Sequence, residues 1–217
     1  MKKINKHEEL LRQQALWEIE NEIHSQGYEM IAGVDEAGRG PLAGPVFAAC
    51  VILPNGCVIN GINDSKKLSE KKRELLFDEI CQKALSYSIA SVDEKTIDEI
   101  NILNATHMAM NMAVNTMTLS PDYVLIDGNS IKNMTIPHST IVKGDAKSIN
   151  IAAASILAKV SRDRYITELA KVYPEYHFEK HKGYGTKLHN EAILKYGPSP
   201  IHRKTFLKKL LGEDWNK

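Results

Sequence analysis

The sequence has few cysteines, few aromatic residues and no long hydrophobic run. Its three cysteines among 217 residues are odd in number and lack metal-site spacing, so we expect reduced thiols rather than a disulfide framework. The apolar run from Val46 to Leu53 is far too short to cross a bilayer, and no signal-like segment is present. These absences argue against a membrane protein and predict a cytoplasmic one.

An excess of charge of one sign is also missing. The chain has 28 Lys and Arg against 27 Asp and Glu, a net charge of +1, so affinity for a polyanion has to come from local clustering. No internal repeat or low-complexity linker interrupts the sequence. A chain of this length can bury one sizeable core, which predicts a single domain with an appended helical lobe.

The stretch from Ile31 to Pro45 is rich in both glycine and charge. An apolar strand, Met30 to Val34, runs into two adjacent carboxylates, Asp35 and Glu36, and four glycines lie within the stretch. Because unpaired charges are costly to bury, acids at the end of a core strand mark either its exit into solvent or a functional site.

Three interpretations of this stretch stay open on the residues alone. A strand followed by a polar turn is the ordinary setting of an Asp-Glu pair. A nucleotide cradle would use the glycines from Gly38 to Gly44, but their spacing is wrong and Pro41 stands where the phosphate-binding helix would begin. In the third interpretation, Asp35 and Glu36 hold a hard divalent metal ion while the glycines approach the substrate.

The rest of the chain alternates predicted strands and helices. Apolar runs predict strands at 46–53, 87–92, 123–126 and 141–142, and helical periodicity predicts helices at 6–26, 70–84, 96–117 and 148–172. We expect Gly27 to end the first helix, Ser69 to cap the second, and a capping box from Thr96 to Glu99 to open the third. The four methionines of the third helix are interpreted as core residues.

Two further acids repeat the theme of the opening stretch. Asp127 follows the strand at 123–126 and precedes Gly128, and neighbouring strands of a sheet bring such ends together. Asp145 stands just ahead of the helix that starts at Ser148, where a negative charge also favours the helix dipole by about 0.3–1 kcal/mol. Lys66, in a polar loop, is a candidate phosphate contact.

The last quarter of the chain is basic. From His177 to Lys209 there are eight Lys and Arg against two Glu, a net charge of +6, together with four histidines. Tyr184 lies between Lys182 and Lys187 on a glycine-containing loop. A charge run is usually a solvated face, but an interleaved aromatic suits a nucleic-acid backbone and a stacked sugar or base. Acids that suit divalent ions, beside such a lobe, suggest metal-assisted phosphodiester chemistry.

From about Tyr28 to Phe206 the sequence resembles the bacterial ribonucleases HII, the type 2 ribonucleases H. The motifs that carry the resemblance are Gly33-Val-Asp-Glu-Ala-Gly-Arg-Gly-Pro-Leu-Ala-Gly-Pro45, Asp64-Ser-Lys66, Ile126-Asp-Gly128, Lys143-Gly-Asp-Ala146, Arg162-Asp163, His181-Lys-Gly-Tyr-Gly-Thr186 and His202-Arg-Lys-Thr-Phe206. The related type HIII enzymes have Gly-Thr-Gly for Gly-Arg-Gly and a Glu as fourth acid, so Arg39 and Asp145 favour type HII.

The resemblance implies an α/β fold: a ribonuclease H-like mixed β-sheet flanked by helices, with a C-terminal helical lobe. It divides the single catalytic domain, 1–217, into an N-terminal helix (1–27), a core (28–163) and a basic lobe (164–217). It assigns metal binding and catalysis to four acids: Asp35, Glu36, Asp127 and Asp145. Substrate contacts are expected from Gly38, Arg39, Gly40, Lys66, Lys143 and Tyr184, and Asp163 is expected to be structural.

The function that the resemblance implies is endonucleolytic. Two Mg²⁺ or Mn²⁺ ions would assist hydrolysis on the 5′ side of a ribonucleotide, leaving 3′-hydroxyl and 5′-phosphate ends. The expected substrates are RNA–DNA hybrids and duplex DNA with embedded ribonucleotides, which points to ribonucleotide excision. The alternatives are another metal-dependent nuclease of the same fold and a non-catalytic nucleic-acid-binding module.

Overall fold

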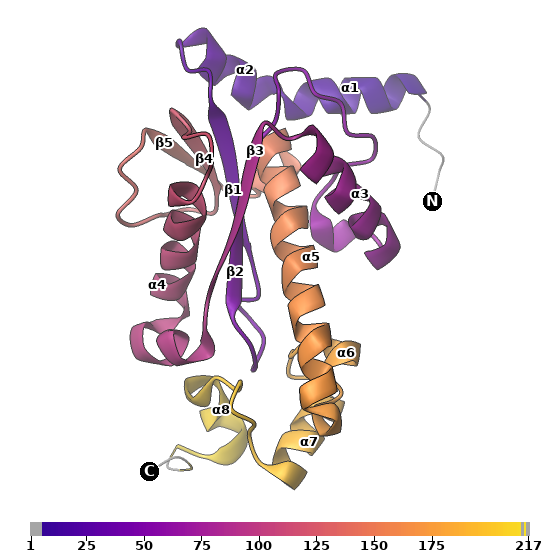
Figure 1. The fold of residues 1–217 in the computed structure, drawn as a ribbon, viewed down its shortest axis with the longest axis vertical. Coiled ribbons are helices and arrows are strands. Elements are labelled where there is room, and N and C mark those ends of the chain that lie inside the picture. The colour runs from indigo at the N-terminus through magenta and orange to yellow at the C-terminus, as the bar shows by residue number, and fades with distance from the viewer. Residues whose placement is uncertain (1–5, 214, 216–217) are drawn as a thin grey trace.

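Strand β1 (Ile31–Ala37) lies at the centre of a five-stranded sheet of order β3-β2-β1-β4-β5. The computed structural model describes residues 6–213 and 215 (Figure 1). The other strands are β2 (Val46–Ile52), β3 (Ser86–Val92), β4 (Tyr123–Asp127) and β5 (His138–Ile141). β1 pairs antiparallel with β2 and parallel with β4, so the sheet is mixed, as the resemblance predicts.

One face of the sheet is covered by helix α5 (Ile149–Val172), which packs most closely on β1. Small side chains at its start, Ala152 to Ala154, are fully buried there together with Ala49 and Val51 of β2. A Cβ atom on Gly33 would lie 2.1 Å from the backbone carbonyl carbon of Asn150, so only glycine permits this approach. The predicted close packing of this helix on a sheet is therefore confirmed.

The opposite face of the sheet is covered by helix α4 (Glu94–Asn115), at the left in Figure 1. The predicted capping box is wrong, because Asp93 caps this helix and accepts a hydrogen bond from the N–H of Thr96. The helix is also interrupted at Asn101, which has a φ of 66°. Of the four methionines, Met110 and Met117 are buried, whereas Met108 and Met112 face solvent.

The N-terminal segment forms two helices, α1 (Lys6–Leu16) and α2 (Glu18–Ser25), instead of the single helix expected. They cross the end of the sheet farthest from the C-terminal lobe (Figure 1). The break falls at Trp17, whose buried indole donates a hydrogen bond to the Cys57 carbonyl. Glu20 of α2 is fully buried, and its carboxylate accepts hydrogen bonds from the Ser148 hydroxyl and the Asn150 N–H.

The remaining caps agree with the sequence. Ser69 caps α3 (Glu70–Lys83) and Ser148 caps α5, while Gly27 follows α2 with a φ of 96°.

Two short 3₁₀ turns, η1 (Ser65–Lys67) and η2 (Gly144–Ala146), lie in polar loops between the longer elements. Within the described residues, none of these helices is apolar over a stretch long enough to span a membrane.

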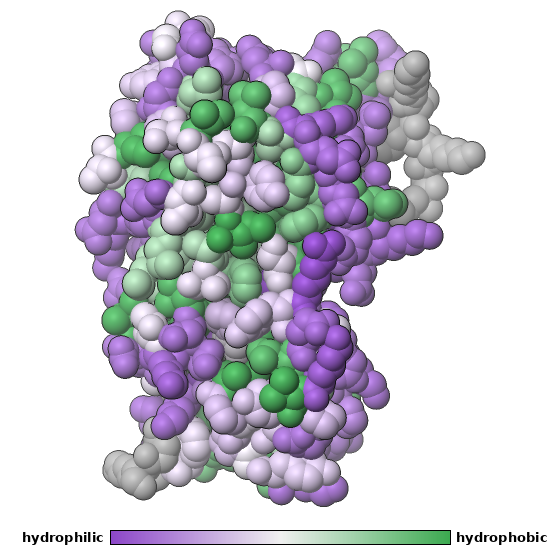
Figure 2. All heavy atoms as spheres, in the orientation of Figure 1, coloured by the Kyte–Doolittle hydropathy of each residue, from purple (hydrophilic) through white to green (hydrophobic). Residues whose placement is uncertain are grey.

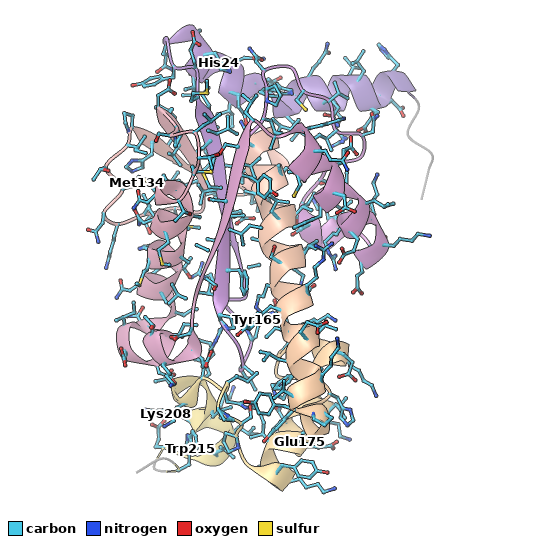
Figure 3. All side chains as sticks on the ribbon, viewed as in Figure 1. His24, Met134, Tyr165, Glu175, Lys208 and Trp215 are labelled. Atoms are coloured by element: carbon cyan, nitrogen blue, oxygen red, sulfur yellow. The ribbon has the colours of Figure 1, made fainter. Side chains whose placement is uncertain are left out.

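The C-terminal lobe lies beyond the other end of the sheet and has an apolar core of its own around Phe178 and Leu207. It contains η3 (Pro174–Tyr176), α6 (Phe178–His181), α7 (Lys187–Tyr196) and α8 (Lys204–Leu211). Tyr165 of α5 packs on Phe47 of β2 near the junction, with ring centroids 5.7 Å apart (Figure 3).

The basic character of the lobe is only partly on its surface. Hydrophilic residues crowd the right-hand edge of the view in Figure 2, and Lys180 and Lys187 are exposed. Arg203, however, is fully buried, and three of the four histidines of the lobe are also buried: His181, His189 and His202. The net charge of the run from His177 to Lys209 therefore overstates the charge presented to solvent.

Candidate active site

Three chain segments bring the predicted acids together. Asp35 and Glu36 lie at the end of β1, as expected, where they pair with Ala49 and Ala48 of β2. Asp127 ends β4, the parallel neighbour of β1, so it emerges at the same edge of the sheet. The η2 turn adds Asp145, and the N–H of Gly144 in this turn donates to Asp127 Oδ1 at 2.6 Å.

The acids are desolvated and repel one another. Asp35 is 6% exposed, and burial raises the pKa of its carboxyl well above the ordinary 3.8, with Glu36, Asp127 and Asp145 adding to the rise. Burial also raises the pKa of Glu36, against the lowering effect of Arg39, whose Nη1 lies 3.6 Å from Glu36 Oε1. These shifts follow from placing like charges in a poorly hydrated site.

A fifth acid joins this group. Burial raises the pKa of Asp145, and the carboxylate of Asp64 raises it further. The motif Asp64-Ser-Lys66 was noted in the sequence, but only Lys66 was given a role. Asp64 Oδ1 accepts a hydrogen bond from the N–H of Lys66 and so caps the η1 turn. Because capping is an ordinary role for such an aspartate, the sequence did not indicate that Asp64 also interacts with Asp145.

The ammonium group of Lys66 interacts electrostatically with the acids of the site. Burial acts to lower the pKa of its ammonium group, but the charges of Asp35, Asp145, Asp64 and Glu36 outweigh burial and the pKa is raised. The lysine is therefore charged while it lines the site. Lys143 differs, because its side chain is exposed and does not line the cleft.

The donor chemistry of the site fits a hard divalent cation. Carboxylate oxygens are the ligands that Mg²⁺ and Mn²⁺ prefer, and a bound cation would relieve the repulsion that raises these pKa values. In residues 6–213 and 215, no three His, Cys, Asp or Glu side chains stand close enough together to hold an ion as they lie. The acids thus supply oxygen ligands of the kind that Mg²⁺ and Mn²⁺ prefer, but they do not surround a single ion position by themselves.

A cleft of about 280 Å³ extends from the acids to the C-terminal lobe. Its walls include three predicted substrate contacts, Gly38, Arg39 and Gly40, and Tyr184 faces them from the lobe. A Cβ atom on Gly40 would lie 3.6 Å from Cε1 of Tyr184, which shows how close the loop and the tyrosine come. The structure therefore brings together the glycine-rich loop and the tyrosine, which are 144 residues apart.

Two cations near the Tyr184 ring were not expected from the sequence. Lys159 of α5 lines the cleft, with Nζ 5.9 Å from the centre of the Tyr184 ring. The guanidinium carbon of Arg162 lies at the same distance from that ring. Spacing along α5 gave no signal for Lys159. Its hydrogen bond to Asp163, at 2.8 Å, is the ordinary pairing of residues four apart on a helix, and agrees with a structural role for that acid.

With this geometry in place, the comparisons with known proteins are informative. The family model for ribonuclease HII matches residues 32–209. A ribonuclease HII of Caldicellulosiruptor saccharolyticus is 58% identical over 195 residues, which cover 90% of this chain and 95% of the relative. A ribonuclease HII of Clostridioides difficile is also 58% identical, over 89% of this chain and 76% of the relative.

Solved structures agree on the fold. The ribonuclease H2 of Pyrococcus horikoshii OT3 superposes with a TM-score of 0.71 at 29% identity, covering 87% of this chain and all of the other. Ribonuclease HIII (Bst-RNase HIII), solved with Mn²⁺, has a TM-score of 0.67 at 17% identity over 89% of this chain and 73% of the other, and supports the fold alone. The mixed sheet, the assembled acids and the match of most of the chain agree, and this protein belongs to the ribonuclease HII family as a ribonuclease H.

Proposed function

We propose that this enzyme cuts the phosphodiester bond on the 5′ side of a ribonucleotide and leaves 3′-hydroxyl and 5′-phosphate ends. Its substrates are RNA–DNA hybrids and DNA duplexes with embedded ribonucleotides, whose removal begins with this cut. The observation that carries the proposal is the juxtaposition of two walls: acids from β1, β4 and η2 on one side, and the loop Gly38–Gly40 with Tyr184 on the other.

The acidic wall is assigned the chemical step. Asp35, Glu36, Asp127 and Asp145 would hold two divalent ions, Mg²⁺ or Mn²⁺, which would activate the attacking water and stabilise the leaving 3′-oxygen. The open arrangement of these acids suits ions that keep water ligands and share the substrate phosphate. Lys66, charged and beside the acids, is placed to contact a phosphate oxygen of the substrate, and Lys143 is a more peripheral phosphate contact.

The second wall is assigned the recognition of the sugar. The 2′-hydroxyl is what distinguishes RNA from DNA at a given site, so a site for embedded ribonucleotides has to contact it. Gly38, Gly40 and Tyr184 line the same cleft, and we assign this contact to the backbone groups of Gly38 to Gly40 and to the Tyr184 hydroxyl. Phosphate contacts by exposed lysines of the lobe carry no sequence information, so cleavage is largely independent of sequence.

Both walls are needed, so the sheet and the lobe act as one catalytic unit. The N-terminal helices are joined to this unit through the hydrogen bonds of Glu20 to Ser148 and Asn150. The acids belong to the sheet and the tyrosine belongs to the lobe, and neither part alone encloses the cleft. The nucleic-acid substrate and the three free cysteines fit a protein that acts in the cytoplasm.

The test is cleavage of a duplex that contains one ribonucleotide, labelled at either end, in Mg²⁺ and in Mn²⁺. We expect a single cut 5′ to the ribonucleotide, a 3′ end that a polymerase extends, and no cut in the all-DNA duplex. The Asp127→Asn variant is the control, since Asn keeps the acceptor for the Gly144 N–H but loses the charge. A cut on the 3′ side would overturn the proposal, because the scissile bond would be the wrong one. A 2′,3′-cyclic phosphate would also overturn it, because the 2′-hydroxyl would then be the nucleophile.

A further inference from the structure

Two buried arginines lie directly behind the glycine-rich loop. Arg162 of α5 is 1% exposed and Arg203, just before α8, is fully buried. Burying a guanidinium group is costly unless its N–H groups are paired, and the usual partner is a carboxylate. Both arginines instead donate to backbone carbonyl groups, most of them in the segment from Gly38 to Pro45.

Arg203 gathers four carbonyl groups of this loop. Its hydrogen bonds go to the oxygens of Gly38 at 2.6 Å, and of Arg39, Pro41 and Gly44 at 2.9 Å each. The backbone N–H of Arg203 also donates to the carbonyl of Leu42 at 2.8 Å. One residue of the lobe therefore fixes the direction of five of the seven carbonyl groups from Gly38 to Gly44.

Fixing the carbonyls also fixes the N–H groups. A trans peptide is planar, so its N–H points opposite to its C=O. When Arg203 draws the oxygens of Gly38 and Arg39 inward, the N–H groups of Arg39 and Gly40 point away from it, and both residues line the cleft. Within the described part of the chain these two N–H groups have no hydrogen-bond acceptor.

The peptide group between Pro41 and Leu42 supports this geometry. Arg203 holds the oxygen of Pro41, and the N–H of the same peptide, on Leu42, points the other way and donates to Gly183 at 2.8 Å. Gly183 is the neighbour of Tyr184, so the loop is hydrogen-bonded directly to the segment that carries the tyrosine. Arg162 adds a second tie, from Lys182 at 3.0 Å to Ala43 at 3.2 Å.

We propose that Arg203 is a positioning residue for ribose recognition: by holding the loop carbonyls behind the site, it presents the N–H groups of Arg39 and Gly40 to the 2′-oxygen of the substrate. This inference rests on the proposed function, and it explains why a cation is buried where no acid pairs with it. Burial lowers the pKa of Arg203 to about 9, so the guanidinium is still charged at neutral pH and its hydrogen bonds are charge-assisted.

The experiment compares binding of two duplexes that differ by one oxygen atom. Dissociation constants are measured in EDTA, which prevents cleavage, for an all-DNA duplex and for the same duplex with one ribonucleotide. The variant Arg203→Lys keeps a positive charge but cannot span four carbonyls, so the preference for the ribonucleotide should fall about tenfold. Affinity for the all-DNA duplex should be unchanged. Arg164→Lys, on the exposed side of α5, is the control and should keep the wild-type preference.

Each outcome decides the matter. A folded Arg203→Lys variant that keeps the preference, or that loses affinity for both duplexes in proportion, overturns the inference. If the variant does not fold, the amide signals of Arg39 and Gly40 in the wild type answer the question by NMR. They should shift with the ribonucleotide duplex and not with the all-DNA duplex, and equal shifts would refute the assignment. A wild-type protein that shows no preference at all would instead refute the proposed function.

Discussion

Replacing His202 by glutamine should change how the stability of the protein depends on pH. His202 Nδ1 lies 2.9 Å from the N–H of Ser199, which can only donate, so the ring carries its proton on Nε2. That Nε2 lies 3.0 Å from Nε2 of His189, and His189 Nδ1 lies 2.9 Å from the carbonyl oxygen of Tyr184. The partners therefore assign both tautomers, and two neutral rings link Ser199 to the backbone of Tyr184.

A proton added to either ring would break one of the hydrogen bonds that link Ser199, His202, His189 and Tyr184. Burial lowers the pKa of His202 to about 3, with His189 adding to the effect, and burial lowers that of His189 to about 4. In the unfolded chain each ring has the ordinary value of 6.5. The unfolded state thus binds more protons as the pH falls, so the stabilisation is complete above pH 6.5 and is lost as the pH falls toward the folded pKa.

The size of the effect is set mainly by the unfolded state. At pH 5 a free histidine with a pKa of 6.5 is almost fully protonated, which favours unfolding by about 2 kcal/mol for each buried ring that stays neutral. His202→Gln can still donate to His189 but cannot titrate. The difference in unfolding free energy between wild type and variant should therefore change by about 2 kcal/mol between pH 7.5 and pH 5.

The assay is urea denaturation of both proteins across this pH range. Acids whose pKa values are raised by burial, such as Glu20 and Asp35, gain protons on folding and act in the opposite direction, but they are present in both proteins and cancel in the difference. His138→Gln, on the exposed edge strand β5, is the control for loss of a solvated ring. If the unfolding free energies of wild type and His202→Gln change with pH in parallel, His202 does not stay neutral in the folded protein.

Three other changes test the site and its supports. Tyr184→Phe should melt at the wild-type temperature and lose single-turnover cleavage. Tyr184→Ala should also lose the stacking of the ring on the substrate, about 1–3 kcal/mol of binding free energy. Early melting of Tyr184→Phe with normal cleavage would show that the ring belongs to the core and not to the site. Lys180→Glu should flatten the dependence of log K on log salt by about 0.9 for each phosphate group that the variant no longer neutralises, without moving the cut, and an unchanged slope would show that this lysine is merely solvated. Glu20→Ala leaves the Ser148 hydroxyl without its buried acceptor and should lower the unfolding free energy by about 1–3 kcal/mol, whereas Glu22→Ala on the exposed side of α2 should not.

The sequence predicted the order of strands and helices well, because buried apolar runs and caps are local signals. It misjudged features that depend on partners elsewhere in the chain. The apolar pattern of the first strand stops at Val34, yet pairing with β2 continues the strand through Asp35 and Glu36 to Ala37. The N-terminal helix was predicted as continuous because its periodicity continues through Trp17, whose hydrogen bond to Cys57 accompanies the break.

The acids and glycines of the site were predicted through the family motifs, and their supports were not. Arg162 and Arg203 belong to recognised motifs, but arginine is rarely buried, and Arg203 was counted with a solvated basic face. Its partners are backbone carbonyls more than 150 residues away, which leave no mark on side-chain patterns. Family membership favours a ribonuclease H over the two alternatives that the sequence left open, another nuclease and a non-catalytic module.

The contact between Glu20 and the start of α5 has a consequence for the way the chain folds during synthesis. The two helices at the N-terminus are made first, yet the partner of Glu20 at Ser148 lies 128 residues later. At ribosomal speeds of about 5–20 residues per second, that delay is about 6–26 s, plus the time needed for the segment to leave the exit tunnel. Helix α2 is therefore synthesised well before α5, and the carboxylate of Glu20 cannot form its buried hydrogen bonds until α5 has been made.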